Sequence, residues 1–316
     1  MAIGTSRQNV HQTIERQMSY QEISITVLQL LHQIRKDHPT MNCRAMYYKL
    51  KPETIGRDAF ELLCREGGFS VSKPLFKPRT TDSTGVIRYP DVLAAVEVTA
   101  PCQAWSSDIT YFEVNNKYYF ITFIIDCFSR KIVGHAVSES LRTTSTTLIA
   151  IRAAIKKAGV MLRPGLVFHS DGGGQYYARE FICFTSKYKM INSMCQMAYE
   201  NGKAERLNRV IKNNYLRHYT IKSFEELQKK VDRAVQLYNQ EKPHKALGYQ
   251  SPEAFENKWL NSQQQTKPIV TESLDAKPKC NRVSNPVTFK QTKPPVPDVL
   301  SANKMVKGVS KTVNQI

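Results

Sequence analysis

The spacing of apolar residues along the chain changes near residue 100. Before that point, apolar residues recur every three or four positions, as in Val27, Leu30, Leu31 and Ile34. This spacing places them on one stripe of an amphipathic helix. Together with end signals such as Gly67-Gly68, the pattern predicts three helices, over residues 25–36, about 42–50 and about 56–66. Residues 1–24 are polar, and we predict no element there.

Residues 72–100 combine prolines with serines and threonines, which is the composition of a linker. Beyond them, β-prone runs alternate with turn residues. Asn115-Asn116 separates two such runs, and an Asn pair tolerates the positive φ angles that short hairpin turns require. We therefore predict a mixed α/β segment with these elements in order: strands 104–114, 117–126 and 131–137, helix 143–158, strand 165–170, and helices 177–188 and 202–217.

Two further helical segments follow. Phe224, Leu227 and Val231 recur at helical spacing and predict a helix over 223–240, and Ser251 is placed to cap another. From about Asn261 the chain is rich in Gln, Lys and Pro and carries nine Lys and Arg against three Asp and Glu. This composition predicts a disordered basic tail over 261–316.

Composition narrows the function classes. Lys and Arg number 45 against 27 Asp and Glu, giving a net charge of +18, which favours a polyanionic partner such as nucleic acid, although any basic surface would give the same count. The seven cysteines include no Cys-x-x-Cys pair, which argues against a structural zinc module. No run of about 18 apolar residues exists, so we expect a cytoplasmic protein that binds no membrane.

Three acids stand in contexts suited to a site. Asp108 interrupts an apolar strand, where an unpartnered carboxylate is costly to bury. Asp171 ends the predicted strand 165–170 and opens onto glycines, and such strand ends are where α/β folds build sites. Glu205 shares one face of a predicted helix with Arg209 and Lys212, whereas Ala204, Leu207 and Ile211 share another.

A cluster of these three carboxylates requires a cation. Without one, each pair at 4 Å repels by about 4 kcal/mol at an effective dielectric of 20. Hard oxygen ligands favour Mg²⁺, with Mn²⁺ as a substitute, and two such ions can hold the attacking and leaving oxygens of a phosphoryl displacement. We therefore expect Asp108, Asp171 and Glu205 to bind two divalent ions and to act on phosphodiesters.

Several motifs occur in order along the chain: Trp105-x-x-Asp-Ile-Thr-Tyr111, Asp126-x-x-Ser-Arg-Lys-Ile-Val-Gly134, His169-Ser-Asp-Gly-x-x-Gln-Tyr176, Glu200-Asn-x-x-Ala-Glu-Arg206 and Tyr238-Asn-x-x-x-Pro-His-x-x-Leu-Gly248. With them, residues from about 25 to about 256 resemble the second-reading-frame transposases of insertion-sequence family three, in the retroviral-integrase superfamily. An ordered set of this length is far more specific than any single motif.

The resemblance implies a fold and a division of the chain. It implies an α/β, ribonuclease-H-like integrase core with a mixed five-stranded sheet and flanking helices, preceded by a small all-α helix-turn-helix-like domain. The expected parts are a polar segment 1–24, a helix-turn-helix-like segment 25–71, a linker 72–100, a catalytic core 101–218, a helical extension 219–260 and a tail 261–316.

The resemblance also implies an activity. It makes Asp108, Asp171 and Glu205 the catalytic acids of a DNA transposase that cleaves insertion-sequence ends and joins them by 3′-hydroxyl attack. Arg209 and Lys212 become candidates for binding the terminal DNA. The expected partners are the terminal repeats, target DNA, further copies of the chain, and an upstream-frame DNA-binding protein or a fusion with it. A structure-selective nuclease of the same fold and an inactive DNA-binding remnant are the alternatives.

Two assignments stay open at this stage. Only 33 residues separate Asp171 from Glu205, where the family usually has about 35; we place the shortening in a loop over 193–199 and retain Glu205, with Glu200 as the competitor. The two helices near 42–50 and 56–66 suggest a DNA-binding pair, with Arg57 and Arg65 on the recognition helix, but an ordinary helical hairpin has the same pattern.

Other polar residues in these motifs have structural interpretations. Asp126 ends a strand before a turn, and we interpret it as a turn residue rather than a metal ligand. His169 lies on an apolar strand, where a buried, hydrogen-bonded histidine is more common than a catalytic base.

Overall fold

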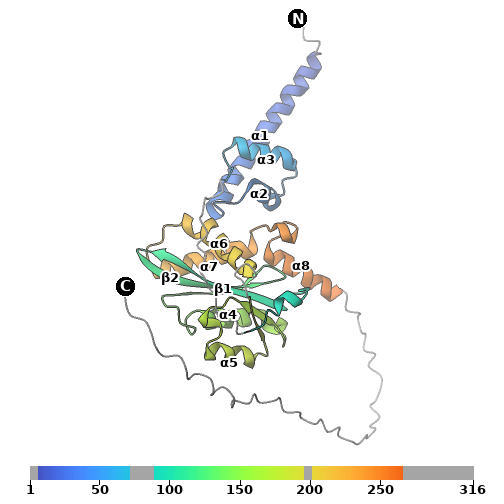
Figure 1. Ribbon diagram of the computed structural model, residues 1–316. Helices are drawn as coiled ribbons and strands as arrows, with labels where there is room; N and C mark the ends of the chain where they lie inside the picture. The colour runs from blue at the N-terminus through green and yellow to red at the C-terminus, as the bar shows by residue number, and fades with distance from the viewer. Residues whose placement is uncertain (1–5, 72–88, 196–200, 266–316) are drawn as a thin grey trace, which may run out of the picture. The chain divides into compact units, whose positions relative to one another are not determined.

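The protein is described here by a computed structural model that covers residues 6–71, 89–195 and 201–265 (Figure 1). Three helices come first: α1 Arg7–Asp37, α2 Cys43–Leu50 and α3 Arg57–Glu66. The predictions for α2 and α3 are confirmed to within a residue. Helix α1, however, begins at Arg7 and not near residue 25, capped by the Ser6 side chain. Its buried residues are Val27, Leu31 and Ile34, whereas the apolar residues of its N-terminal half, such as Val10, Ile14 and Met18, are exposed.

The three N-terminal helices share one hydrophobic core. Leu31 of α1, Met46 of α2 and Phe60 of α3 are all fully buried in it. Helix α2 begins after Asn42, whose side chain accepts a hydrogen bond from the Ala45 amide. Helix α3 is followed by Gly67-Gly68, and Gly68 takes a φ of 75°, a conformation that favours glycine.

A five-stranded sheet forms the centre of the following region, in the order β3-β2-β1-β4-β5. The strands are β1 Ala104–Val114, β2 Lys117–Asp126, β3 Ile132–Ser138, β4 Val167–Ser170 and β5 Ile191–Met194. Strands β1, β2 and β3 pair antiparallel, whereas β4 is parallel to β1 and to β5. Asn115 and Asn116, with φ of 50° and 62°, make the turn between β1 and β2, as predicted.

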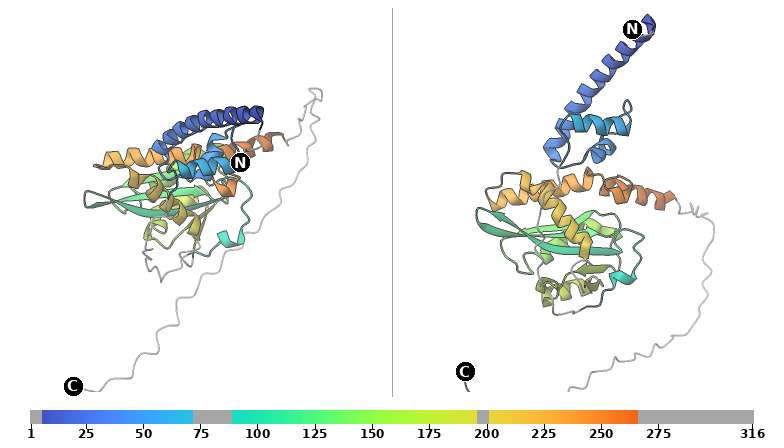
Figure 2. Two further views of the ribbon diagram at one scale, coloured as in Figure 1. Left: turned by 90° about the horizontal axis from the view of Figure 1, so that it is seen from above. Right: turned by 45° about the horizontal axis from the view of Figure 1, so that its top comes forward.

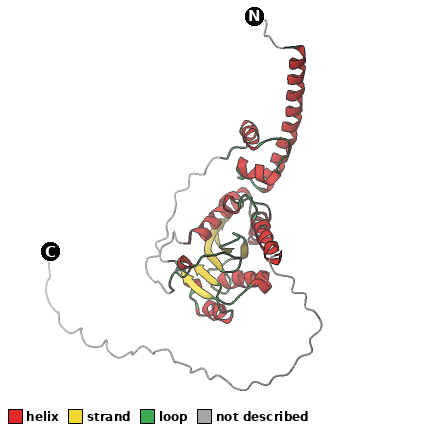
Figure 3. Cartoon of the chain, turned by 90° about the vertical axis from the view of Figure 1, so that its right-hand side faces the viewer, coloured by secondary structure: helices red, strands yellow, loops and turns green. Residues whose placement is uncertain are grey.

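Helices cover both faces of the sheet (Figures 2 and 3). On one face lie α4 Thr147–Ala158 and α5 Arg179–Lys187; on the other lie α6 Gly202–Asn214 and α7 Phe224–Gln240. Strand β2 packs against both layers because its side chains alternate: Phe123 contacts the α6 and α7 side, and Ile124 the α4 side. The predicted mixed sheet with flanking helices is therefore confirmed.

The remaining elements are short turns and a last helix. Single 3₁₀ turns occupy η1 Leu93–Ala95, η2 Gly159–Met161, η3 Gly174–Tyr176, η5 Leu216–His218 and η6 Lys245–Leu247. Helix α8 spans Pro252–Gln265, so residues 261–265, which we assigned to the tail, are helical; the rest of the predicted tail lies outside the described residues. None of the described helices has the length and apolar character needed to cross a bilayer.

Strand β5 corrects one interpretation of the sequence. Ser193 and Met194 belong to this edge strand, whereas we placed the start of a shortened loop at Ser193. The strand has four residues and includes the polar Asn192 and Ser193, so it lacks both the length and the alternation by which strands are recognised. Its place in the sheet comes from pairing with β4, which only the folded chain provides.

Candidate active site

Asp108 and Asp171 stand side by side on neighbouring parallel strands. In the register of β1 and β4, Ser107 is paired with Ser170, and each aspartate is the next residue of its chain. Paired residues of parallel strands direct their side chains to the same face. The carboxyl group that interrupts β1 is therefore adjacent to the one that follows β4, as the sequence predicted.

The environment of these carboxyl groups disfavours negative charge. Burial, the neighbouring Asp171 charge and, more weakly, Glu205 raise the pKa of Asp108 to about 7. Burial also raises the pKa of Asp171, although the Gly173 amide donates a 3.1 Å hydrogen bond to its Oδ1. At Asp108, a bound cation would therefore favour full ionisation at neutral pH.

Helix α6 brings Glu205 to the same site. Ala204, Leu207 and Ile211 are buried against the sheet, whereas Glu205 is exposed in the first turn. The helical-wheel assignment is confirmed for these residues. One turn after Glu205, Asn208 donates a 2.8 Å hydrogen bond from Nδ2 to Oδ2 of Asp108. The charge of Glu205 acts on Asp108, which shows that the first turn of α6 lies near this aspartate.

A buried asparagine, absent from the sequence-based candidates, attaches the start of α6 to β1. Asn201 accepts a hydrogen bond from the Ser106 hydroxyl and donates one of 2.9 Å from Nδ2 to the carbonyl of Ser107. These contacts end one residue before Asp108. The motif Glu200-Asn-x-x-Ala-Glu-Arg206 contains Asn201 but does not predict this role, because the Asn201 side chain binds β1 and does not cap α6. Glu200, the competing third acid, lies outside the described residues.

Tyr176 lies on the buried side of the aspartate pair. The Tyr176 hydroxyl lies 2.9 Å from the Ser107 hydroxyl, which in turn donates to the carbonyl of Phe123 at 2.9 Å. Burial, with the charges of Asp171 and Asp108, raises the pKa of Tyr176 well above its ordinary value. Tyr176 is therefore a neutral, buried neighbour of the acids, and its ring is unavailable to DNA.

Lys212 and Arg209 lie further along α6, in different surroundings. The Lys212 ammonium lies 5.2 Å from the centroid of the Tyr111 ring, and burial and Arg217 lower its pKa, while Asp108 opposes that shift. Arg209 is exposed to solvent. Lys212 is thus held close enough to the acids to be influenced by them, and Arg209 is available on the surface.

Arg57 and Arg65, the other candidate DNA contacts, do not join this site. Both are exposed on α3, whose buried residues belong to the N-terminal core. Arg57 forms a 2.9 Å ion pair with Asp58, and Arg65 donates weakly, at 3.4 Å, to the Glu61 carbonyl. Neither arginine is buried, and the exposed contacts of both are weak. This is expected of side chains on a surface that binds a polyanion.

The carboxylate oxygens of the site suit a hard divalent ion, but the side chains do not form a closed coordination shell. Among the described residues, no three His, Cys, Asp or Glu side chains converge tightly enough to hold one ion together. Asp108 and Asp171 are the adjacent pair, and Glu205 stands outside them on the exposed face of α6. Mg²⁺ needs only one or two protein carboxylates, since water and substrate phosphates complete its shell.

Two polar residues near the site have structural roles. Asp126 is buried and accepts hydrogen bonds from the amides of Cys102 and Ser129, each at 2.8 Å, which confirms its interpretation as a turn residue. His169 is also buried, with Nδ1 3.0 Å from the Ser193 hydroxyl and 3.7 Å from Asp91. His169 therefore links β4 to β5.

Comparison with known proteins agrees with this arrangement. The family described as integrase core domain matches residues 98–199, and a second family of the same description matches residues 187–252. The uncharacterized 31 kDa protein of insertion element IS600 from Shigella sonnei is 28% identical over 212 residues, covering 65% of this chain and 76% of that protein. Transposase InsF for IS3A from Escherichia coli K12 is 27% identical over 226 residues, covering 70% and 76%. These matches support an IS3-type DDE transposase.

Part of the chain is also similar to solved structures. The HTLV-2 integrase catalytic core domain, solved in complex with magnesium, is 19% identical and covers 50% of this chain and 97% of its own, with a TM-score of 0.40. The family assignment, with the transposase relatives, makes the IS3-type transposase a polynucleotidyl transferase of DNA transposition. The family assignment does not identify the catalytic residues, which must be inferred from the geometry of the chain.

Proposed function

We propose that this transposase cleaves DNA at the ends of its own insertion sequence and joins the liberated 3′-hydroxyl to a phosphodiester, with Asp108, Asp171 and Glu205 as the catalytic acids. The observation that supports this most directly is the register of β1 and β4, which sets Asp108 beside Asp171. The pKa of about 7 for Asp108 supports it as well, because a carboxyl group held in this state is suited to binding a cation.

The metal requirement follows from the same groups. Asp108 and Asp171 would hold one divalent ion between them, and Glu205 would complete a second site from α6. Mg²⁺, or Mn²⁺ in its place, supplies charge neutralisation and activation of the attacking oxygen. The protein's own contribution is positional: Asn201 fixes the start of α6 against β1, and Asn208 orients the Asp108 carboxylate and stabilises its charged form.

DNA contacts are proposed on two helices. Arg209 and Lys212 follow Glu205 on α6 and are placed to bind phosphates that flank the cleaved bond. Arg57 and Arg65 on α3 are exposed cations on the second helix of the proposed helix-turn-helix-like segment 25–71. Because exposed cations bind DNA mainly through its phosphates, their contribution should depend on salt.

We propose that the transposase acts as a homo-multimer on two insertion-sequence ends and a target DNA. Work on two ends in one complex requires more than one active site, which a symmetric multimer supplies. An upstream-frame DNA-binding protein, separate or fused by frameshifting, is the further partner that we propose for recognition of the ends. The catalytic core 101–218 and the helical extension 219–260 would remain common to both forms.

Strand cleavage and joining on a labelled duplex that carries the element's own end tests the proposal. The wild type with Mg²⁺ or Mn²⁺ should give joined product, and Asp171→Asn and Glu205→Gln should each abolish it. Cleavage without joining would instead identify a nuclease, and DNA binding without either reaction a remnant or a missing upstream partner. Loss of activity through Glu200→Gln, with Glu205→Gln active, would move the third acid to Glu200.

A further inference from the structure

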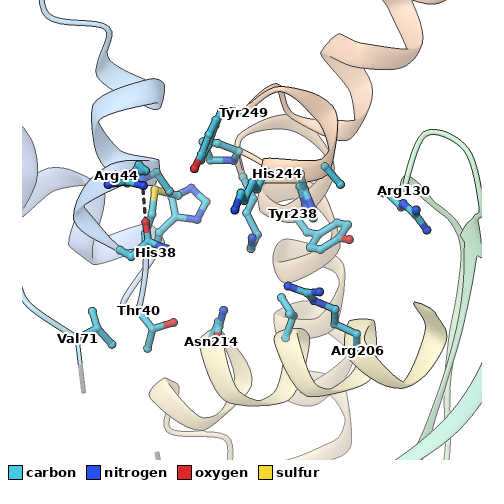
Figure 4. A pocket seen from close by; sticks show the side chains of 18 of the residues that line it. His38, Thr40, Arg44, Val71, Arg130, Arg206, Asn214, Tyr238, His244 and Tyr249 are labelled. Carbon is cyan, nitrogen blue, oxygen red and sulfur yellow. Dashed lines mark hydrogen bonds between the residues drawn. The ribbon is translucent and has the colours of Figure 1, made fainter. Parts of the chain in front are cut away.

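A large pocket lies away from the aspartate pair, and its charge is almost entirely positive (Figure 4). It has a volume of about 1150 Å³. Seven lysine and arginine side chains line it among the described residues, against a single carboxylate, Glu61, which is already paired with Arg44 at 2.8 Å. Such an excess of one charge around a cavity attracts anions and focuses their potential inside it.

Four of the lining residues lie within the sequence motifs of the chain but are not among its proposed catalytic acids. Arg130 lies in the turn between β2 and β3, with a φ of 61°, in the motif Asp126-x-x-Ser-Arg-Lys. Arg206 follows Glu205 on α6, and Lys242 and His244 follow α7. Figure 4 shows Arg130, Arg206 and His244 at this pocket, and the rings of Tyr238 and His244 are in contact, with their centroids 4.8 Å apart. Three segments far apart in the sequence thus bring cations to one cavity.

The positively charged groups that line the pocket repel one another when no anion is bound. Burial and the charge of Arg206 lower the pKa of Lys242 to about 8. Burial, then Lys242, Arg130 and Arg206, lower the pKa of His244 to about 3. The His244 Nε2 atom is buried and has no hydrogen-bond partner in the described part of the chain. Arg130 and Lys242 are half-buried, and the other five cations of the lining, Arg206 among them, are exposed. An anion bound in the pocket would offset the repulsion among these charges.

We propose that this pocket is a second DNA-binding site, in which Arg130, Arg206 and Lys242 bind backbone phosphates of duplex DNA outside the catalytic centre. Duplex DNA is the polyanion on which the enzyme acts, and its backbone phosphates supply the counter-charge that the cations of the pocket lack. The chain's own segment beyond residue 260 does not suit the pocket, because it carries nine Lys and Arg against three Asp and Glu.

Equilibrium binding to a fluorescein-labelled duplex of arbitrary sequence tests the site without relying on catalysis. The full chain is titrated in EDTA over a series of KCl concentrations. Arg206→Gln and Lys242→Gln should each weaken binding and reduce the slope of log K against log salt by about 0.9, the value for one phosphate contact. Lys187→Gln, which removes an exposed cation from α5 on the opposite layer, is the matched control and should leave the slope unchanged. Unchanged slopes in both pocket variants would overturn the proposal.

Chemical protection gives a second readout that a folding defect would not mimic. Amine acylation of the wild type at pH 8, read by mass spectrometry, should modify Lys242 readily, and the duplex should protect it, whereas Lys187 should be equally reactive with and without DNA. Protection by 10 mM inorganic phosphate alone, with none from the duplex, would identify a site for a small free anion and refute a DNA site. Because neither assay uses metal or cleavage, loss of the catalytic proposal would leave both results intact.

Discussion

Asn208 donates a 2.8 Å hydrogen bond from Nδ2 to Oδ2 of Asp108 and so links the middle of α6 to the centre of β1. The other side-chain atom of Asn208, Oδ1, is buried and has no partner among the described residues. The amide therefore serves the aspartate alone. It favours the charged form of Asp108 against burial and against Asp171, both of which raise the pKa.

The first prediction concerns this hydrogen bond. Asn208→Leu removes a donor that lowers the pKa of Asp108, so that pKa should rise above about 7. Since the carboxylate must be charged to bind metal, the acidic limb of the pH–rate profile for strand cleavage should move to higher pH. A hydrogen bond to a charged group contributes about 1.5–3 kcal/mol, which sets the upper limit of the shift at roughly two pH units. Asn208→Gln should restore part of it, and an unshifted profile in Asn208→Leu would show that the amide does not act on Asp108.

The second prediction concerns stability without metal. The pKa of Asp108 is raised from an ordinary 3.8 to about 7 in the folded protein, so the folded state binds this proton more tightly than the unfolded state. The resulting stability is fully present below pH 3.8 and is lost as the pH rises to about 7, by at most roughly 4 kcal/mol. Asp108→Asn removes this loss. In EDTA at pH 8 the variant should melt at a higher temperature than the wild type.

Magnesium provides the control for that experiment. Added Mg²⁺ should raise the Tm of the wild type, because the ion binds only the folded site, and should leave that of Asp108→Asn nearly unchanged. A wild type that neither gains stability from Mg²⁺ nor melts below the variant at pH 8 would contradict both the raised pKa and the assigned metal ligand.

The hairpin of β1 and β2 shows how far the sequence alone reaches. Its two strands and the Asn115-Asn116 turn were predicted to the residue, since local signals determine all three. The sequence also predicts that Asp108 and Asp171 come together, because an acid that interrupts or ends an apolar run is conspicuous. Strand β5 and the N-terminal half of α1 were missed, because the first depends on a partner strand and the second buries nothing.

The roles of two asparagines at the site could not be predicted from the sequence. Asn201 and Asn208 resemble any other helix asparagine in the sequence, and their roles come from contacts with Ser107 and Asp108 about a hundred residues earlier. Tertiary hydrogen bonds of this separation leave no local pattern. The spacing of Glu205, Arg209 and Lys212 gave the correct exposed and buried faces of α6, but not the difference between the exposed Arg209 and the half-buried Lys212.

The third prediction uses Asn201. Asn201→Ala would leave the Ser107 carbonyl and the Ser106 hydroxyl without their partner in a buried setting, at a cost of about 1–3 kcal/mol each. The start of α6, with Glu205, would then be held less firmly against β1. We expect a lower midpoint in urea and a fall in the rate of the cleavage step that exceeds the fall in DNA affinity. Equal loss of affinity and rate would assign Asn201 to general folding and not to positioning.

The fourth prediction concerns the close packing of α4 on β3. A Cβ at Gly134 would collide with the backbone carbonyl of Ala150 and approach the side chain of Ala154. Backbone cannot yield as a flexible side chain can, so Gly134→Ala should destabilise the protein by about 1–3 kcal/mol. Gly56→Ala is the control, since Gly56 has no atom within 4 Å of the added methyl group and a negative φ. Denaturant midpoints compare the two, and equal midpoints would show that α4 lies further from β3.

The last prediction separates Arg209 from Lys212 on α6. Arg209 is exposed, so Arg209→Gln should weaken DNA binding, reduce the salt slope by about 0.9 and leave the cleavage rate at saturating DNA almost unchanged. Lys212 is half-buried over Tyr111 and interacts with Asp108, so Lys212→Gln removes a positive charge that favours the Asp108 carboxylate. Its loss should lower the cleavage rate at saturating DNA and move the acidic limb of the pH profile upward. Because both variants remove one cation from one helix, each is the other's control, and identical effects on affinity and rate would mean that Lys212 binds phosphate only.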